Sequence, residues 1–223
     1  MQPAVRVVSD ARRPRAPRRM LGLVTVWALS LAGGMSALAA YGASPGAQAP
    51  APATWPADLR DALPMAPGTT RVVMAAHPRC PCTQASIREL ERIAGRSGGK
   101  LRATVLFFEP AASDAAWAEG TLWRWADAIP GVTALRDPEG RLAARFGALT
   151  SGHVVVYGAD ERLAFAGGIT GARGHEGDNA GQAAVLELVR AGPDAPAPLG
   201  NPVFGCDLRE PERAPPDRNR PDR

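Results

Sequence analysis

Beyond its first 20 residues the chain has no excess of positive charge. Residues 1–20 carry six arginines and one aspartate, so the rest of a chain whose net charge is +4 has a net charge of −1. A nucleic-acid-binding surface needs clustered cations, so we expect no nucleic-acid partner. The only lysine is Lys100, and the basic isoelectric point therefore belongs to the N-terminal arginines.

Charge is also missing from residues 20–41, an apolar run long enough to cross a bilayer core of about 30 Å as a helix. Arginines precede this run and none follows it closely, which predicts a basic cytoplasmic tail at 1–19, a single-pass anchor in the inner (cytoplasmic) membrane and a periplasmic body. The alternative is a signal peptide, because Ala37-Leu38-Ala39 fits the small-x-small cleavage pattern. We favour an uncleaved anchor, since the run exceeds the usual signal-peptide core of about 7–15 residues.

Cysteine is scarce, and two of the three cysteines lie one residue apart, Cys80 and Cys82, between an apolar strand pattern and a helical pattern. A thiol at a helix N-terminus faces unpaired N–H groups and the positive end of the helix dipole, which favour the thiolate. We expect Cys80 to be the N-cap, with its sulfur facing solvent as the attacking thiol. Cys82 would then resolve the mixed disulfide. Arg79 adds positive charge. The alternative is an unreactive structural pair.

The composition divides the rest of the chain into four segments. Residues 42–66 are predicted to be a Pro/Ala-rich linker, whose first part, 42–57, has too few large apolar groups to pack and holds the domain off the membrane. Trp55 is its one candidate anchor. Residues 67–192 form the domain, 193–208 a docking tail that contains Cys206, and 209–223 a disordered charged tail.

The domain alternates between strand and helix patterns. We predict strands at 71–76, 101–108, 132–136, 153–157 and 162–166, and helices at 81–95, 114–129, 141–146 and 180–191. The last two strands flank a turn at 158–161 and form a hairpin. This order predicts an α/β fold with a central mixed sheet flanked by helices.

That order, with cysteines at the first strand–helix junction, resembles the thioredoxin fold. The motif from Asp137 through Phe146-Gly147 and Val154-Val155-Val156-Tyr157 to Gly167 is similar to the exported TlpA- and Sco-type proteins. Three strings, 77–83, 167–181 and 202–206, resemble a bacterial group called RedB, and this likeness covers residues 67–208.

Two departures from thioredoxins bear on the site. The cysteine spacing is Cys-x-Cys, and Thr150-Ser151-Gly152-His153 replaces the Thr-cis-Pro that those proteins carry before the hairpin. Ser151 and Gly152 leave room and an N–H donor beside the thiols. We therefore predict that both residues bind substrate or tune the thiolate, in a mode different from the standard one.

Cys206 is the odd cysteine, and it follows the last predicted helix by 15 residues. That helix is ~18 Å long, whereas the following segment spans more than ~40 Å when extended. Val203 and Phe204 supply apolar groups for docking. We therefore expect Cys206 to return to Cys80 and Cys82 as a third redox thiol or a metal ligand. A free or partner-facing thiol is the alternative.

The polar loop at 171–179 follows the last strand, which in this fold runs parallel to the first. The loop should therefore flank the cysteine turn, where Arg173 and His175 would hold a thiolate, move a proton or recognise an anion. A capped loop with a solvated histidine is the alternative. His153 should lie near the cysteines, although His153 and His77 are each more simply packing or surface residues.

These features favour a thiol–disulfide oxidoreductase that acts on an exported protein partner without a cofactor. The alternative is a Cu(I)-binding or delivery protein of Sco-like type, with Cys80 and Cys82 joined by His153, His175 or Cys206. Histidine and methionine are scarce around the cysteine pair, which favours redox chemistry over copper binding. The missing cis-proline argues the other way, because an ordinary thioredoxin-like oxidoreductase should keep it. A peroxidase ranks last because no Pro-x-x-x-Thr-x-x-Cys string precedes either cysteine. A binding module without chemistry stays open.

Overall fold

The computed structural model describes residues 18–63, 69–111, 113, 115–191 and 200–209. The predictions for the basic tail before residue 18, for 193–199 and for the charged tail after residue 209 lie outside these residues. The chain divides into two units, with the boundary at residues 40 and 41. In the first unit, helix α1 (Arg18–Gly42) is apolar and long enough to cross a membrane, a property that it shares with signal sequences near an N-terminus.

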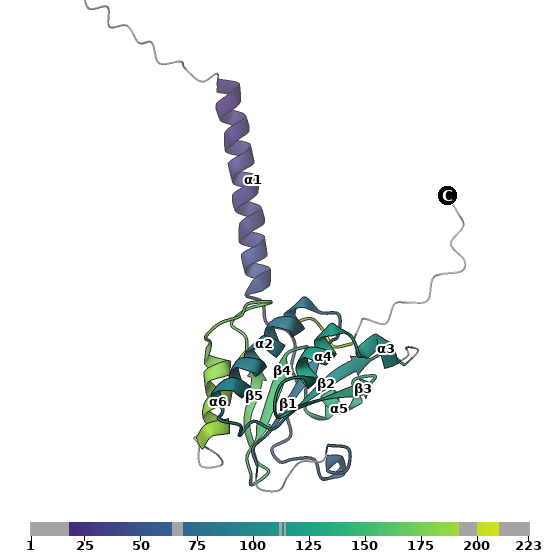
Figure 1. Cartoon of the computed structure of the whole chain (residues 1–223). Helices are drawn as coiled ribbons and strands as arrows, with labels where there is room; N and C mark the ends of the chain where they lie inside the picture. The colour runs from purple at the N-terminus through teal and green to yellow at the C-terminus, as the bar shows by residue number, and fades with distance from the viewer. Residues whose placement is uncertain (1–17, 64–68, 112, 114, 192–199, 210–223) are drawn as a thin grey trace, which may run out of the picture. The chain divides into compact units, whose positions relative to one another are not determined.

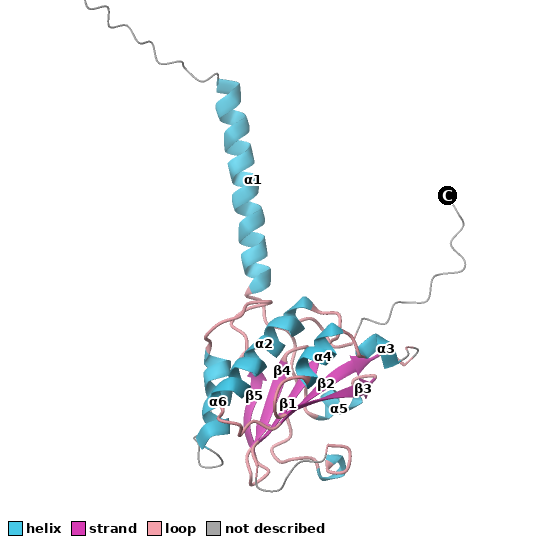
Figure 2. Ribbon diagram, in the orientation of Figure 1, coloured by secondary structure: helices cyan, strands magenta, loops and turns pink. Residues whose placement is uncertain are grey.

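The second unit is built on a five-stranded mixed sheet (Figures 1 and 2). Its strand order is β3-β2-β1-β4-β5. The strands are β1 (Arg71–Ala76), β2 (Ala103–Glu109), β3 (Val132–Pro138), β4 (His153–Tyr157) and β5 (Leu163–Gly168). β1 pairs in parallel with β2 and β2 with β3, whereas β4 is antiparallel to both β1 and β5. β5 therefore runs parallel to β1, as predicted, and the loops after β1 and β5 leave the same edge of the sheet.

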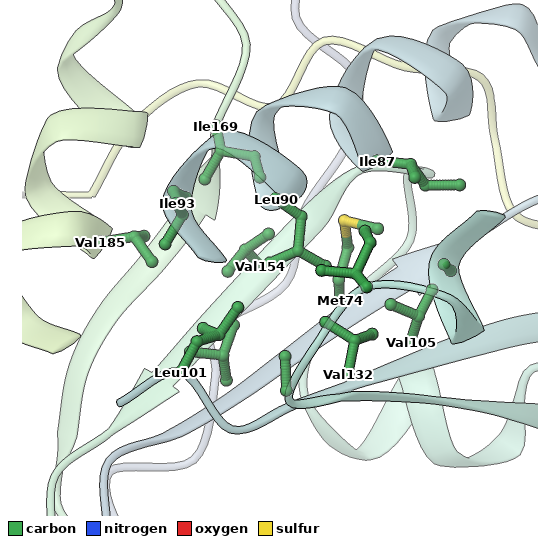
Figure 3. Close-up of a cluster of buried hydrophobic side chains, with 14 of the residues drawn as sticks. Met74, Ile87, Leu90, Ile93, Leu101, Val105, Val132, Val154, Ile169 and Val185 are labelled. Atoms are coloured by element: carbon green, nitrogen blue, oxygen red, sulfur yellow. The ribbon is translucent and has the colours of Figure 1, made fainter. Parts of the chain in front are cut away.

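Helices cover both faces of the sheet. On one face lie α2 (Pro81–Arg96), α3 (Ala115–Ala118), α4 (Thr121–Asp127) and α6 (Ala180–Ala191), and on the other lies α5 (Arg141–Arg145). The alternation of side chains along β1 produces this division, because Met74 faces α2 and α6 whereas Val73 faces α5. Figure 3 shows the first core, in which Met74 packs among Leu90, Val154 and their neighbours. The sheet and helices confirm the predicted thioredoxin-like α/β class.

One predicted helix is divided in two. The pattern over 114–129 predicts a single helix, whereas the structure has α3 and α4 separated at Gly120. Gly120 is extended, with φ −81° and ψ −158°, and it is the N-cap of α4. The apolar spacing of Trp117 and Leu122 continues through the break because both residues pack against the same core. Apolar periodicity therefore did not reveal the interruption.

The segment expected to be an unpacked spacer lies against the domain instead. The Ala49 N–H donates to Gly147 O over 2.9 Å and the Trp55 N–H to Glu161 O over 2.8 Å. Trp55 is 3% exposed, and its ring lies 5.3 Å from the rings of both Phe146 and Tyr157. A few backbone hydrogen bonds and one large aromatic side chain are thus sufficient to fix a segment that is otherwise rich in alanine and proline.

Candidate thiol site

The site begins where β1 ends and α2 starts. Cys80 is the N-cap of α2, with φ −100° and ψ 125°, and Pro81 occupies the first helical turn, where its missing N–H is not needed. The Cys80 N–H donates to His77 O over 3.2 Å, and the Thr83 N–H donates to Cys80 O over 3.0 Å. The strand-to-helix junction therefore holds Cys80 at the positive end of the helix, as the sequence predicts.

The C-terminal segment brings Cys206 to this junction. The Sγ atoms of Cys80 and Cys206 lie 2.8 Å apart, although the two residues are 126 positions apart in the sequence. The Sγ atoms of Cys80, Cys82 and Cys206 all lie within 4.8 Å of one another. The predicted return of Cys206 to the Cys-x-Cys turn is thus confirmed as a placement, and we call these three residues the cysteine cluster.

The environment separates the three thiols by acidity. Burial raises the pKa of Cys80, but hydrogen bonds from the Cys206 thiol and from the Thr83 N–H outweigh it, and the net pKa lies below the ordinary value. Burial and the neighbouring charge of Cys80 raise the pKa of Cys82. Burial, together with donation to Cys80, raises the pKa of Cys206 to about 12. The pKa of Cys80 is therefore shifted down and those of Cys82 and Cys206 up, so Cys80 is the most acidic thiol of the cysteine cluster.

The expected exposure of Cys80 is wrong. Cys80 is 3% exposed and Cys82 8%, whereas Cys206 is only partly buried. The prediction treated the helix N-terminus as open to solvent, but the segment that carries Cys206 lies over it. The sulfur with the lowest pKa is thus also the most enclosed of the three.

Ser151 and Gly152 stand at the expected place beside the thiols, but their N–H groups are already used. The Ser151 N–H donates to Cys206 O and the Gly152 N–H to Ala75 O, both over 2.8 Å. Gly152 has φ 88°, and a Cβ there would lie 2.6 Å from the Ser86 hydroxyl, so glycine is required. The Ser151 N–H, which we expected to be open to a substrate, therefore binds the protein's own C-terminal segment.

The Ser151 side chain joins a hydrogen-bonded group that sequence reasoning missed. Its hydroxyl accepts the His77 N–H over 2.9 Å and lies 2.6 Å from the Thr83 hydroxyl. Thr83 in turn donates to His77 O over 2.8 Å. Ser151 and Thr83 are both fully buried. The position of Thr83 in the third residue of the helix was the available signal, because a hydroxyl there reaches the turn before the N-cap.

The loop after β5 flanks the cysteine cluster, as predicted. The Arg173 guanidinium donates to Gly205 O through Nη1 and to Ser44 O over 3.1 Å through Nε. Its charge acts to lower the pKa of Cys82, against the burial that raises it. His175 is exposed, and its Nδ1 lies 3.3 Å from Arg173 O. Arg173 is therefore in place to hold the C-terminal segment, whereas His175 is engaged within its own loop.

The remaining predicted residues lie outside the cysteine cluster. The Arg79 guanidinium lies 4.6 Å from the centre of the Trp117 ring, on the exposed side of the turn. His153 is 1% exposed, and neither of its ring nitrogens has a hydrogen-bond partner among the described residues. Burial lowers the pKa of His153 to about 4, so the ring is neutral at physiological pH. Among the described residues, the group of metal-ligating side chains within reach of one another contains neither His153 nor His175.

Several solved structures are similar to this chain. The chain is similar to an uncharacterized conserved protein from Geobacillus kaustophilus, with a TM-score of 0.52 and 17% identity, over 77% of this chain and 95% of that one. It is also similar to a hypothetical protein of Sinorhizobium meliloti, with a TM-score of 0.49 and 21% identity, over 74% and 93%. A secreted disulfide oxidoreductase of Mycobacterium tuberculosis matches with a TM-score of 0.39 and 18% identity, over 56% and 83%. The sequence matches no protein-family model and no curated protein.

Sheet topology and helix placement together define a thioredoxin-like α/β protein whose described residues include a three-cysteine cluster at the first strand–helix junction. At these identities the structural likeness extends to the fold alone. The resemblance to the RedB group and to the TlpA and Sco proteins stays a prediction from the sequence.

Proposed function

We propose that the chain is a membrane-tethered, extracytoplasmic thiol–disulfide oxidoreductase that acts on an exported protein partner. The observation that carries this proposal is the 2.8 Å separation of the Cys80 and Cys206 sulfurs at a helix N-terminus. Formation of one disulfide removes two electrons and two protons from the pair, and a partner disulfide accepts both. The lowered pKa of Cys80 favours its thiolate, which makes Cys80 a good leaving group when the disulfide is attacked. No bound cofactor takes part.

The internal disulfide in this proposal joins Cys80 to Cys206 rather than to Cys82. A disulfide between Cys80 and Cys82, which have a single residue between them, closes a small ring that we expect to be strained. Cys80 and Cys206, in contrast, come from separate segments of the chain. Cys82 lies close enough to both sulfurs to accept a disulfide by exchange. In this proposal Cys82 forms the disulfide with Cys80 when Cys206 is bonded to a partner.

The test is equilibration of the full-length protein, in detergent micelles, with glutathione buffers of graded redox potential. Samples are quenched with N-ethylmaleimide, and the disulfides are mapped by mass spectrometry. We expect a reversible two-electron transition that forms the Cys80–Cys206 bond. Cys80→Ser should leave only a Cys82–Cys206 bond as the possible product, and Cys82→Ser, the matched control, should leave the Cys80–Cys206 bond intact. A protein that forms no reversible disulfide would contradict the proposal.

The location is part of the proposal and has its own support. Helix α1 is apolar and long enough to span a membrane, and the six arginines of residues 1–20 lie before it or in its first turn. The positive-inside rule then places the domain outside the cytoplasm, where disulfides persist. Intact mass of the membrane-bound protein separates an anchor from a cleaved signal. Protease added to spheroplasts should digest the domain only if it faces outward.

A second function, Cu(I) binding, is favoured by one observation, the three sulfurs within 4.8 Å of one another. Soft thiolates select Cu(I). Three sulfurs each about 2.3 Å from a central metal, the usual metal–thiolate distance, lie about 4 Å apart, so small movements of these side chains suffice. The proposed ligands are Cys80, Cys82 and Cys206, so that Cys206, rather than His153 or His175, completes the site among the third ligands that the sequence suggested.

Competition with a Cu(I) chelator tests this second function on the fully reduced protein. We expect one equivalent of Cu(I) per chain. Cys82→Ser should weaken binding at least tenfold, because a three-sulfur site becomes a two-sulfur site. His175→Ala and His153→Leu should leave the affinity unchanged. Loss of binding in either histidine variant would show that the ligand set is wrong.

A further inference from the structure

The residues that carry Cys206 form an arm that is fixed on both sides of the cysteine cluster. We define the C-terminal arm as residues 200–209. Near its start, Asn201 pairs with the end of β5: the Gly168 N–H donates to Asn201 O over 3.2 Å, and the Asn201 side-chain amide donates to Gly168 O over 2.9 Å. Near its end, the Leu208 N–H donates to Leu149 O over 2.9 Å. The C-terminal arm is therefore hydrogen-bonded to the domain at both of its ends.

Beside the thiols, the C-terminal arm is joined to the rest of the domain by backbone hydrogen bonds and an isolated bridge. Thr150 and Asp207 form an antiparallel bridge, and the Ser151 N–H donates to Cys206 O. Two apolar side chains anchor this stretch on either side of Cys206, since Val203 is 0% and Leu208 3% exposed. The backbone contacts and the two buried side chains together fix the position of the C-terminal arm, so the Cys206 sulfur is held at Cys80.

The fit leaves no space for a side chain at the residue before Cys206. A Cβ on Gly205 would overlap the Ser151 carbonyl oxygen. A Cβ on Gly168 would lie 3.0 Å from the Val203 Cα. These are contacts with backbone atoms, which cannot rotate away, so both glycines are required for the arm to dock.

Docking of the C-terminal arm decides which sulfur meets solvent. With the arm in place, Cys80 is 3% and Cys82 8% exposed, and Cys206 is the partly exposed member of the cysteine cluster. A protein partner cannot approach the enclosed Cys80 without displacing the arm. It can approach Cys206 directly.

We propose that Cys206 is the sulfur at which the partner exchanges, and that Cys80 exchanges only with Cys206 behind it. This inference rests on the proposed oxidoreductase function. In the oxidised protein, a partner thiolate attacks Cys206 Sγ, the Cys80–Cys206 bond breaks, and its electron pair leaves on Cys80. A second partner thiolate then attacks the partner sulfur bound to Cys206, closes the partner disulfide and releases Cys206, which takes up a proton. The reverse sequence reduces a partner disulfide.

The experiment locates the first mixed disulfide. The full-length Cys82→Ser protein is used so that Cys82 cannot take part in disulfide exchange. It is oxidised with glutathione disulfide and then treated briefly with reduced glutathione. N-ethylmaleimide stops the reaction, and peptide mapping locates the glutathione. We expect glutathione on Cys206 and N-ethylmaleimide on Cys80 in at least a tenfold excess over the reverse arrangement. Glutathione on Cys80, or an even distribution, would overturn the proposal.

A matched pair of glycine variants tests the role of the C-terminal arm. Gly205→Ala places a methyl group against Ser151, whereas Gly95→Ala places one in open space on α2. We expect Gly205→Ala to move the adduct towards Cys80 and Gly95→Ala to leave it on Cys206. An adduct that stays on Cys206 in both variants would show that docking does not direct exchange. If no Cys80–Cys206 disulfide forms at all, the proposed function itself fails, an outcome distinct from an adduct on the wrong cysteine.

Discussion

The Ser151 hydroxyl accepts a hydrogen bond from the His77 N–H over 2.9 Å, and it thereby ties the turn before Cys80 to the edge that receives Cys206. Ser151→Ala would leave that buried N–H unpaired, so we expect a loss of about 1–3 kcal/mol in the free energy of unfolding. Urea titration of the full-length protein, followed by tryptophan fluorescence, measures it. Ser113→Ala, which removes a hydroxyl that donates to the nearby Pro110 O over 2.8 Å, is the control. Equal effects of the two substitutions would rule out the structural role of Ser151.

The neutral, buried ring of His153 predicts a pH dependence of stability. Its pKa falls to about 4 on folding, from about 6.5 in the unfolded chain. Between these values the unfolded state binds more protons, so stability rises with pH. The favourable contribution is fully present above about pH 6.5 and is lost as the pH falls, by about 3 kcal/mol at pH 4. Unfolding free energies at several pH values measure this slope.

Replacement of His153 by leucine should flatten that slope, because the buried titrating group is gone. His175→Ala removes an exposed histidine and should leave the slope unchanged. Carboxylates contribute equally to all three proteins, so the difference between the variants isolates His153. An unchanged slope in His153→Leu would mean that the ring is accessible to protons in the native state.

Trp55 should be the main anchor of the segment before the domain. Its side chain is 3% exposed between Phe146 and Tyr157, and the Arg71 guanidinium lies 5.0 Å from the centre of its ring. We expect Trp55→Ala to reduce the free energy of unfolding by about 3–5 kcal/mol. Trp125→Ala, at a 38% exposed tryptophan, should cost about 1 kcal/mol or less. Limited proteolysis should cut Trp55→Ala protein near residues 46–55 first.

Asp137 predicts a further stability effect through helix α5. Its two carboxylate oxygens accept the N–H groups of Leu142 and Ala143, both over 2.8 Å, and it is 1% exposed. Asp137→Ala leaves both donors unpaired at a helix start, and we expect a loss of about 2–3 kcal/mol. Glu139→Ala is the control, since that carboxylate is exposed. A urea midpoint for Asp137→Ala equal to that of Glu139→Ala would contradict the capping role.

The sequence was sufficient for the sheet and for the meeting of the thiols because both depend on strong local patterns. Strand β4 at 153–157 and helix α6 at 180–191 agree with the prediction to the residue, since turn residues and apolar periodicity bound them clearly. The placement of Cys206 followed from chain length and from two apolar docking groups. The bounds of the elements and the placement of Cys206 thus depend only on local sequence patterns and on the length of the connecting segment.

What the sequence did not reveal depends on contacts between distant segments. The burial of Cys80 follows from the C-terminal arm that lies over it, and the packing of residues 46–55 follows from a single tryptophan. The Ser151 N–H was expected to be open, because no local pattern says that Cys206 O is its partner. In each case the deciding contact joins residues more than about 50 positions apart in the chain, as in the Ser151–Cys206 hydrogen bond, and neither periodicity nor composition encodes such a contact.

The place of Cys206 in the chain has a consequence for the turnover of the protein in the cell. A bond to Cys80 would close a loop across most of the domain, since the two residues are 126 positions apart. A loop of that size restricts the denatured chain enough to raise the free energy of unfolding by about 5 kcal/mol, against about 2 kcal/mol for a Cys80–Cys82 bond. The reduced form is therefore the one that unfolds more readily. Proteases would therefore degrade the reduced protein in preference to the oxidised one, so the rate of degradation would report the redox state.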